Sequence, residues 1–422
     1  MKTTVKILFV LGLSAIFTNY SHAQNEDNSS KRAFQLTLVT PLGTNGLEAR
    51  NKTNNFSINI LAGYNGGLKG AEFGGFANIL KGDMDGVQFA GYANIDLQKG
   101  KGFQGAGFIN YNHQKFRGVQ FSGYANVALA SSSGFQGSGF ANVVRGNYNG
   151  VQLTGFVNVV TDSIDGFQGA GFANYSKSNT KGQIAGFSNF NFSDTRGPQI
   201  SGFGNINDGC LKGLQLSGFA NINTKELDGA QISGFFNYTK SLKGLQLGVF
   251  NYVDSLEKGV SIGLVSFVRN GYHKFEISGN ESMYGVLSYK TGTNSFYNII
   301  AVGASVRDER IYWGWGYGIG TIVPLKGRVD LNLEAISFQV NDDDNWDADR
   351  LNLHNRVNAL VAVRLSDNLT VFGGPSWNVL VSDVTDGKAI NSDYAPWHVF
   401  NKTYNNKTNV KMYPGFSVGV RF

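Results

Sequence analysis

The sequence is poor in cysteine, proline and charged residues, and these shortages exclude several classes of protein. Cys210 is the only cysteine, so no disulfide can form within the chain. Charged residues make up 16% of the chain, below the usual ~25%, whereas aromatic residues reach 13%. Extensive disorder is therefore not expected, because disordered chains are rich in charge and poor in aromatic residues.

Long apolar segments are also lacking. No segment after residue 23 is long enough for a transmembrane helix, so any membrane embedding must use closed β-strands. Glycine, in contrast, accounts for 56 of the 422 residues. It does not fall at every third position, which excludes collagen, and it disfavours a helical solenoid because each interior helical glycine costs ~1 kcal/mol. The composition therefore indicates a β-rich chain in which backbone segments pass close to one another.

Residues 1–23 have the pattern of a secretory signal peptide. Lys2 and Lys6 precede a short apolar run, and Ser21, His22 and Ala23 provide a cleavage site after Ala23. Without the two lysines the formal charge falls from +6 to +4, which gives no support for nucleic-acid binding.

A repeat of about 16 residues, G-x-Q-x-x-G-[FY]-x-N, fills residues 67–270 in about thirteen copies. Glutamine recurs at one position and asparagine six residues later. The glutamines are Gln88, Gln104, Gln120, Gln136, Gln152, Gln168, Gln183, Gln199, Gln215, Gln231 and Gln246. The asparagines are Asn78, Asn94, Asn110, Asn126, Asn142, Asn158, Asn174, Asn189, Asn205, Asn221, Asn237 and Asn251.

Two architectures fit this repeat. A β-solenoid would use one coil per unit and stack the amides as ladders, with glycines at tight corners. It is favoured by apolar residues two places before the first glycine, which a closed coil needs for its core: Met84, Phe116, Tyr148, Ile164, Leu211 and Leu227. The alternative is an antiparallel meander, which the extra glycines Gly105, Gly137 and Gly169 favour through their 32-residue spacing.

The flanks predict an outer-membrane β-barrel. Apolar residues alternate with polar or small ones in residues 34–39 and 56–64, and again in 311–322, 329–334, 357–365 and 416–422. We expect an all-β fold with a barrel of about ten strands, two from residues 24–66 and about eight from residues 271–422. The solenoid would be inserted between them.

The last strand is more specific. Phe416, Val418, Val420 and Phe422 share one face, and the strand resembles the terminal strand by which bacterial outer-membrane barrels are recognised and inserted. Together with the signal peptide and the repeat Gly118-Val119-Gln120 through Gly123-Tyr124-Ala125-Asn126, it resembles surface-repeat outer-membrane proteins of Gram-negative bacteria. The resemblance implies location and shape and supplies no catalytic residues.

Candidate chemistry is sparse. In the acidic run 341–349, Asp343, Asn345 and Asp347 are weak candidate Ca²⁺ ligands, although a solvated loop is the simpler interpretation. His113, His273, His354 and His398 form no metal-binding or hydrolase motif. An aromatic column is expected in the core, and would suit sugars or a partner strand if exposed: Phe76, Tyr92, Phe108, Tyr124, Phe140, Phe156 and Phe172.

We therefore expect a non-enzymatic outer-membrane protein without a cofactor, acting as a scaffold or binding a partner, for example in adhesion. Expected partners are outer-membrane lipid, the barrel-assembly machinery through the strand ending at Phe422, and an unidentified surface or periplasmic ligand. The first alternative is a transport pore with the repeats as plug or funnel. The third hypothesis, after scaffold or binding protein and transport pore, is an outer-membrane enzyme, for which the sequence offers no catalytic constellation.

Overall fold

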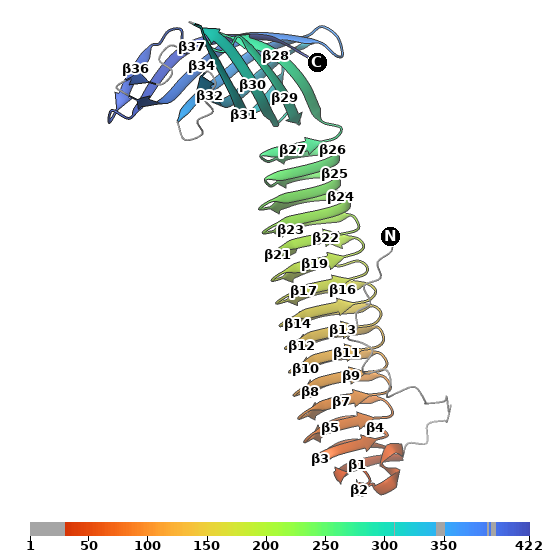
Figure 1. Ribbon diagram of the computed structural model, residues 1–422. Helices are drawn as coiled ribbons and strands as arrows, with labels where there is room; N and C mark the ends of the chain where they lie inside the picture. The colour runs from red at the N-terminus through yellow and green to blue at the C-terminus, as the bar shows by residue number, and fades with distance from the viewer. Residues whose placement is uncertain (1–29, 308, 343–350, 386–387, 390–393) are drawn as a thin grey trace, which may run out of the picture.

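The protein is described by a computed structural model, which covers residues 30–307, 309–342, 351–385, 388–389 and 394–422. The predicted signal peptide lies outside the described residues. The described elements are nearly all strands, in a parallel solenoid sheet followed by an antiparallel sheet (Figure 1). Among the helices in these ranges, none has the length and apolarity needed to cross a membrane.

The solenoid has about 14 coils, and most coils from β4 to β17 have a longer strand followed by a shorter one; β24, β25 and β26 are continuous strands that span both positions. Equivalent strands of successive coils pair in parallel, so that Gly118 lies between Gly102 and Gly134. This confirms the predicted solenoid, and the alternative meander is wrong. The elements are β1(Ser30–Val39), β2(Leu42–Gly43), η2(Gly46–Asn51), β3(Lys52–Asn65), β4(Gly67–Gly74), β5(Ala77–Leu80), β6(Met84–Ala90), β7(Ala93–Asp96), β8(Gly100–Ala106), β9(Ile109–Asn112), β10(Phe116–Ser122), β11(Ala125–Ala128), β12(Ser132–Ser138), β13(Ala141–Val144), β14(Tyr148–Thr154), β15(Val157–Val160), β16(Ile164–Ala170), β17(Ala173–Ser176), β18(Gly182–Ala185), β19(Ser188–Asn191), β20(Thr195–Arg196), β21(Gln199–Ser201), β22(Gly204–Asn207), β23(Leu211–Ser217), β24(Ala220–Ser233), β25(Phe236–Leu247), β26(Phe250–Ile262) and β27(Val265–Val268).

Two amide ladders run through the solenoid interior. From Gln104 onward, each glutamine side chain donates to the glutamine of the preceding coil, as Gln104 does to Gln88 at 2.9 Å. The asparagines donate in the opposite direction, as Asn94 does to Asn110 at 2.9 Å. Amides suit this stack because each supplies both a donor and an acceptor. The predicted ladders are confirmed, and their members are fully buried or nearly so.

The other half of the interior is apolar. The residues expected to fill the core are all buried: Met84, Phe116, Tyr148, Ile164, Leu211 and Leu227. Glycine is required where coils touch through their backbones. Gly86 has φ 150°, and a Cβ there would lie 1.9 Å from the Gly70 carbonyl oxygen.

The 32-residue spacing comes from packing on the outside of the coils. A Cβ on Gly105 would lie 2.7 Å from the Phe89 ring of the preceding coil and 3.3 Å from the Phe103 ring. Coils with phenylalanine at the first of these outward positions therefore have glycine at the second. The neighbouring coils have Val87 with Phe89 and Val119 with Phe121 instead.

The N-terminal flank belongs to the solenoid, so its predicted place in a barrel is wrong. Strand β1 pairs in parallel with β3, and β3 pairs in parallel with β4 and β5. Polar residues such as Gln35, Asn54 and Asn59 face inward, and Phe34 and Phe56 face outward. The alternation was misleading because apolar side chains point outward in both sheets. The solenoid therefore precedes the second sheet and is not inserted into it.

The second sheet closes on itself. Eight antiparallel strands, β28 to β34 and β37, pair in order, and β37 returns to pair with β28. We call these strands the closed sheet. The predicted count of about ten strands, two of them from residues 24–66, is wrong, because the closed sheet has eight strands, all from residues 271–422. Two short strands, β35 and β36, extend this sheet to ten. The elements are β28(Tyr272–Asn280), β29(Gly285–Gly292), β30(Tyr297–Arg307), β31(Arg310–Pro324), β32(Val329–Asp342), β33(Asn352–Arg364), β34(Thr370–Thr385), β35(Lys388–Ala389), β36(Phe400–Tyr404) and β37(Thr408–Arg421).

The last coil is bonded to one rim of the closed sheet. The Ser266 N–H donates to the Asn298 side chain at 2.9 Å, and the Asn298 amide donates to the Gly263 carbonyl at 2.7 Å. His273 contacts the Val268 carbonyl at 2.6 Å. These contacts occupy polar groups at the end of the parallel stack, where an uncovered strand edge would invite pairing with another chain.

Candidate functional site

The structure describes only part of the residues singled out from the sequence. Asp343, Asn345 and Asp347 lie outside the described residues. Within the described ranges, no group of three or more histidine, cysteine, aspartate and glutamate side chains could hold a metal ion.

The histidines are dispersed. His113 and His398 are exposed in connections between strands, His113 in the solenoid and His398 before β36. His273 lies at the junction with the last coil, and His354 is buried against Asn378 at 3.0 Å and Tyr394 at 2.9 Å. In the part of the chain that the structure describes, no histidine bonds to both a serine and a carboxylate. The serine-hydrolase arrangement therefore has no support.

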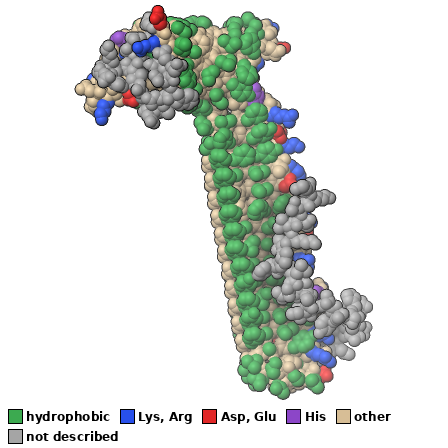
Figure 2. All heavy atoms as spheres, viewed as in Figure 1, with side chains coloured by type: hydrophobic (Ala, Val, Ile, Leu, Met, Phe, Trp, Pro, Cys, Tyr) green, Lys and Arg blue, Asp and Glu red, His purple; other side chains and the backbone are tan. Residues whose placement is uncertain are grey.

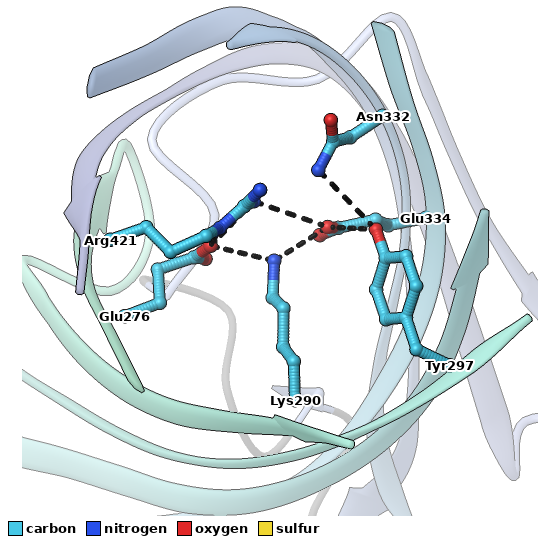
Figure 3. A network of polar contacts seen from close by, with 6 residues as sticks. All are labelled: Glu276, Lys290, Tyr297, Asn332, Glu334 and Arg421. Carbon is cyan, nitrogen blue, oxygen red and sulfur yellow. Dashed lines mark hydrogen bonds and ion pairs between the residues drawn. The ribbon is translucent and has the colours of Figure 1, made fainter. Parts of the chain in front are cut away.

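A charged cluster occupies the interior of the closed sheet (Figure 3). Lys290 lies 2.6 Å from Glu276 and 2.5 Å from Glu334. Arg421 pairs with Glu276 at 2.8 Å, and the Tyr297 hydroxyl donates to Glu334 at 2.7 Å. Two acids balance two bases, which offsets the cost of burying all four charges. The sequence has no local signal for this cluster, because its five members come from five strands, β28, β29, β30, β32 and β37.

Side chains fill the interior of the closed sheet. The pocket lined by Glu276, Glu334 and Arg356 has a volume of only about 20 Å³, room for about one water molecule. Beyond it, large side chains such as Phe338, Tyr394 and Tyr413 form a buried apolar cluster. Glycines on β31 make room for these rings, since a Cβ on Gly316 would lie 2.6 Å from Phe338.

The outside of the closed sheet is apolar. Exposed large side chains occur on all eight of its strands: Phe275, Ile277, Leu287, Ile300, Val302, Trp315, Ile319, Leu333, Val357, Val361, Trp377, Phe416 and Val418. Compared with a soluble protein, burial is thus inverted for the enclosed charges and for the outward apolar residues, while part of the interior is apolar as well.

An aromatic column on the solenoid is also exposed, so its predicted role in core packing is wrong. Its rings stack face to face at coil corners, with centroids 4.7 to 5.1 Å apart and planes within 10°. The stacked rings belong to Phe76, Tyr92, Phe108, Tyr124, Phe140, Phe156, Phe172, Phe187, Phe203, Phe219 and Phe235. Amides and other core residues already fill the interior, so the rings face outward.

Two further uncharged columns flank the rings. One lies on the longer strands and contains Phe73, Phe89, Gly105, Phe121, Gly137, Leu153, Gly169, Ile184, Ile200, Leu216, Ile232, Leu247 and Ile262. The other lies on the shorter strands and contains Ile79, Ile95, Tyr111, Val127, Val143, Val159, Tyr175, Phe190, Ile206, Ile222, Tyr238, Tyr252 and Phe267. We call the three columns the apolar edge, and Figure 2 shows apolar side chains running along the rod.

Two acids are buried among the solenoid amides. Glu72 occupies a glutamine position and accepts from Gln88 at 2.9 Å. Burial raises the pKa of Glu72, and it raises the pKa of Asp96 well above its ordinary value, with the charge of Glu72 adding to that rise. One Asp96 oxygen and the facing Asn112 oxygen have no donor within the described residues. A proton on Asp96 would supply a donor there.

The chain matches no protein-family model, no curated protein and no solved structure. Membership of the surface-repeat family stays a prediction, and the functional argument depends on the geometry above.

Proposed function

We propose that this chain is a non-enzymatic outer-membrane protein whose closed sheet is the membrane anchor and whose solenoid is a scaffold. The observation that carries the proposal is the inverted burial of the closed sheet. Apolar side chains such as Ile300 and Val361 point outward, and the charges of Lys290 and Glu334 are enclosed. A closed antiparallel sheet pairs all its strands, which is what hydrocarbon surroundings require.

The connections of the closed sheet support a periplasmic solenoid. At the rim that contacts the solenoid they are short, comprising residues 293–296, 325–328 and 365–369. At the opposite rim, two are long, comprising residues 343–351 and 386–407. Outer-membrane barrels have short periplasmic turns and longer external loops. We therefore infer that the scaffold faces the periplasm, which favours a partner there over adhesion to an external surface.

The filled interior disfavours the transport alternative. Open channels occur in barrels with many more strands than eight, and small barrels are filled by side chains. The charged cluster and a pocket of only about 20 Å³ beside it indicate an interior packed with side chains in the described part of the closed sheet. We expect no single-channel conductance from the purified protein in planar bilayers.

The membrane anchor is tested by expressing the chain in an outer-membrane host. We expect the protein to resist carbonate extraction and to migrate differently on a gel before and after boiling. A soluble protein with unchanged migration would exclude the anchor and leave a secreted all-β scaffold. A stable single-channel conductance would support the transport alternative.

A further inference from the structure

We propose that the apolar edge of the solenoid docks on the surface of the lipid bilayer that the closed sheet spans. The rod would then lie along the membrane instead of projecting from it. The inference rests on the proposed membrane anchor and adds a second lipid contact made by the repeats.

The apolar edge is too large and too uniform to be ordinary surface. The exposed rings of the aromatic column include Phe76 at 54% and Phe156 at 40%. With roughly 200 Å² for each aromatic side chain and exposure near 40%, eleven rings present roughly 900 Å² of apolar surface. The largest patch of a typical monomer is about 300–600 Å². None of the three columns contains a charged residue.

The backbone beneath the rings is compatible with lipid. The Tyr92 N–H donates to the Phe76 carbonyl at 2.8 Å, and the Phe108 N–H donates to the Tyr92 carbonyl at 3.0 Å. The same bond recurs between later coils, for example from Phe203 to Phe187 at 2.9 Å. Corner amides paired in this way lose no hydrogen bond when water is replaced by acyl chains.

The placement of the two sheets favours the bilayer as the occupant. In Figure 1 the closed sheet extends to the left from the top of the rod, across the rod's long axis. Figure 2 shows the apolar columns along the front of the rod towards its left, and the charged side chains on the right. A membrane spanned by the closed sheet would therefore meet the rod on its apolar side, starting at the rim bonded to Ser266 and Val268.

The opposite side of the rod suits water. Exposed ion pairs connect neighbouring coils there, between Lys101 and Asp85 at 3.7 Å and between Lys181 and Asp165 at 2.6 Å. The rod is thus amphipathic in the manner of an interfacial helix, with an aromatic side for the headgroup boundary and a charged side for solvent.

A fluid bilayer fits the edge better than a protein does. The two longer columns have thirteen members each, so at about 4.8 Å per coil they form a stripe roughly 60 Å long. Lipid can cover such a stripe without matching its register, whereas a protein partner must reproduce its period. A second copy of this chain has that period, and spin labelling distinguishes pairing of two copies from lipid contact.

The test uses single spin labels on the full chain in a Cys210→Ser background, reconstituted in phosphatidylethanolamine–phosphatidylglycerol vesicles. Phe156→Cys reports on the apolar edge, and Asp162→Cys in the same coil is the matched control on the charged side. Ile300→Cys reports on the anchor. Collisions with oxygen, which concentrates in lipid, are compared with collisions with a water-soluble nickel chelate.

We expect the oxygen-to-nickel ratio to be severalfold higher at positions 156 and 300 than at position 162. Lipid access at position 300 with water access at position 156 would overturn the docking and keep the anchor. No lipid access at position 300 would overturn the anchor itself. A label at position 156 shielded from both probes and coupled to a second label would indicate pairing of two copies and also overturn the docking.

Folding of each labelled chain is checked by its gel shift before boiling. If Phe156→Cys does not fold, Phe219→Cys and Thr224→Cys repeat the comparison in another coil. The same outcomes then apply.

Discussion

The solenoid and the closed sheet both enclose polar groups, but they use different ones. The solenoid interior has neutral amides, such as Gln104 bonded to Gln88, whereas the closed sheet has ions, such as Lys290 between Glu276 and Glu334. Parallel, in-register coils place like residues next to like, so an interior residue must pair with its own kind. Antiparallel strands of a closed sheet place unlike residues together, so acids can meet bases.

Replacing ladder glutamines by acids should give the largest loss of stability, because stacked coils would then place like charges next to each other. We expect the double variant Gln136→Glu, Gln152→Glu to lower the free energy of unfolding by on the order of 5 kcal/mol, because two buried carboxylates then face each other. The exposed change Asn147→Asp in the same region should have little effect. Denaturant unfolding followed by circular dichroism measures both, and equal midpoints would show that the ladder tolerates charge.

Unbalancing the charged cluster should cost somewhat less. Lys290→Met removes the base between Glu276 and Glu334, and we expect a loss of about 3–5 kcal/mol from the unpaired acids. Adding Glu334→Gln should recover part of the loss, since charge balance returns. Urea midpoints of the folded gel band measure the effect. If the double variant were less stable than Lys290→Met, charge balance would not be what stabilises the cluster.

A charge on the outside of the closed sheet distinguishes lipid from water. Ile300 is 49% exposed, and Ile300→Arg should destabilise the anchor in vesicles by about 2–4 kcal/mol if this position lies near mid-membrane. Ile300→Leu should be nearly neutral. Unfolding in vesicles is the measurement, and identical stabilities would argue that this face does not contact lipid.

The smallest change in stability should come from the titration of Asp96, whose pKa is raised well above its ordinary value. The folded chain keeps the Asp96 proton at pH values where the unfolded chain has released it. Stability should therefore fall as pH rises from the ordinary value of 3.8 towards the raised pKa, by up to about 1.4 kcal/mol per pH unit. Asp96→Asn should remove this slope, and the exposed control Asp85→Asn should keep it. Unfolding midpoints at several pH values measure it, and an unchanged slope would assign the effect elsewhere.

The solenoid could be predicted from the sequence because equivalent residues make similar contacts in successive coils, which gives the sequence a regular period. The spacing of Gln88 and Gln104 predicted both the solenoid and the amide ladders, which the structure confirms. The side of the coil that an aromatic residue faces was not predictable, because alternation shows which residues share a face but not whether that face is buried. Phe156 could therefore point inward or outward. For the same reason, the strand containing Phe56 was assigned to the wrong sheet. The pairing of Glu276 with Arg421 depends on closure of the sheet, and no local pattern encodes it.

Both ends of the solenoid differ from its middle. At the start, β1 pairs with the short strand β2, and at the finish the last coil is bonded to the closed sheet through Ser266 and Asn298. Most steps between them repeat the same backbone contacts, as Gly118 shows by facing equivalent glycines on both sides. A gene duplication that adds one unit would therefore lengthen the rod by about 4.8 Å and leave both ends unchanged. Descendants of such a gene are free to differ in the number of coils while sharing the same two ends.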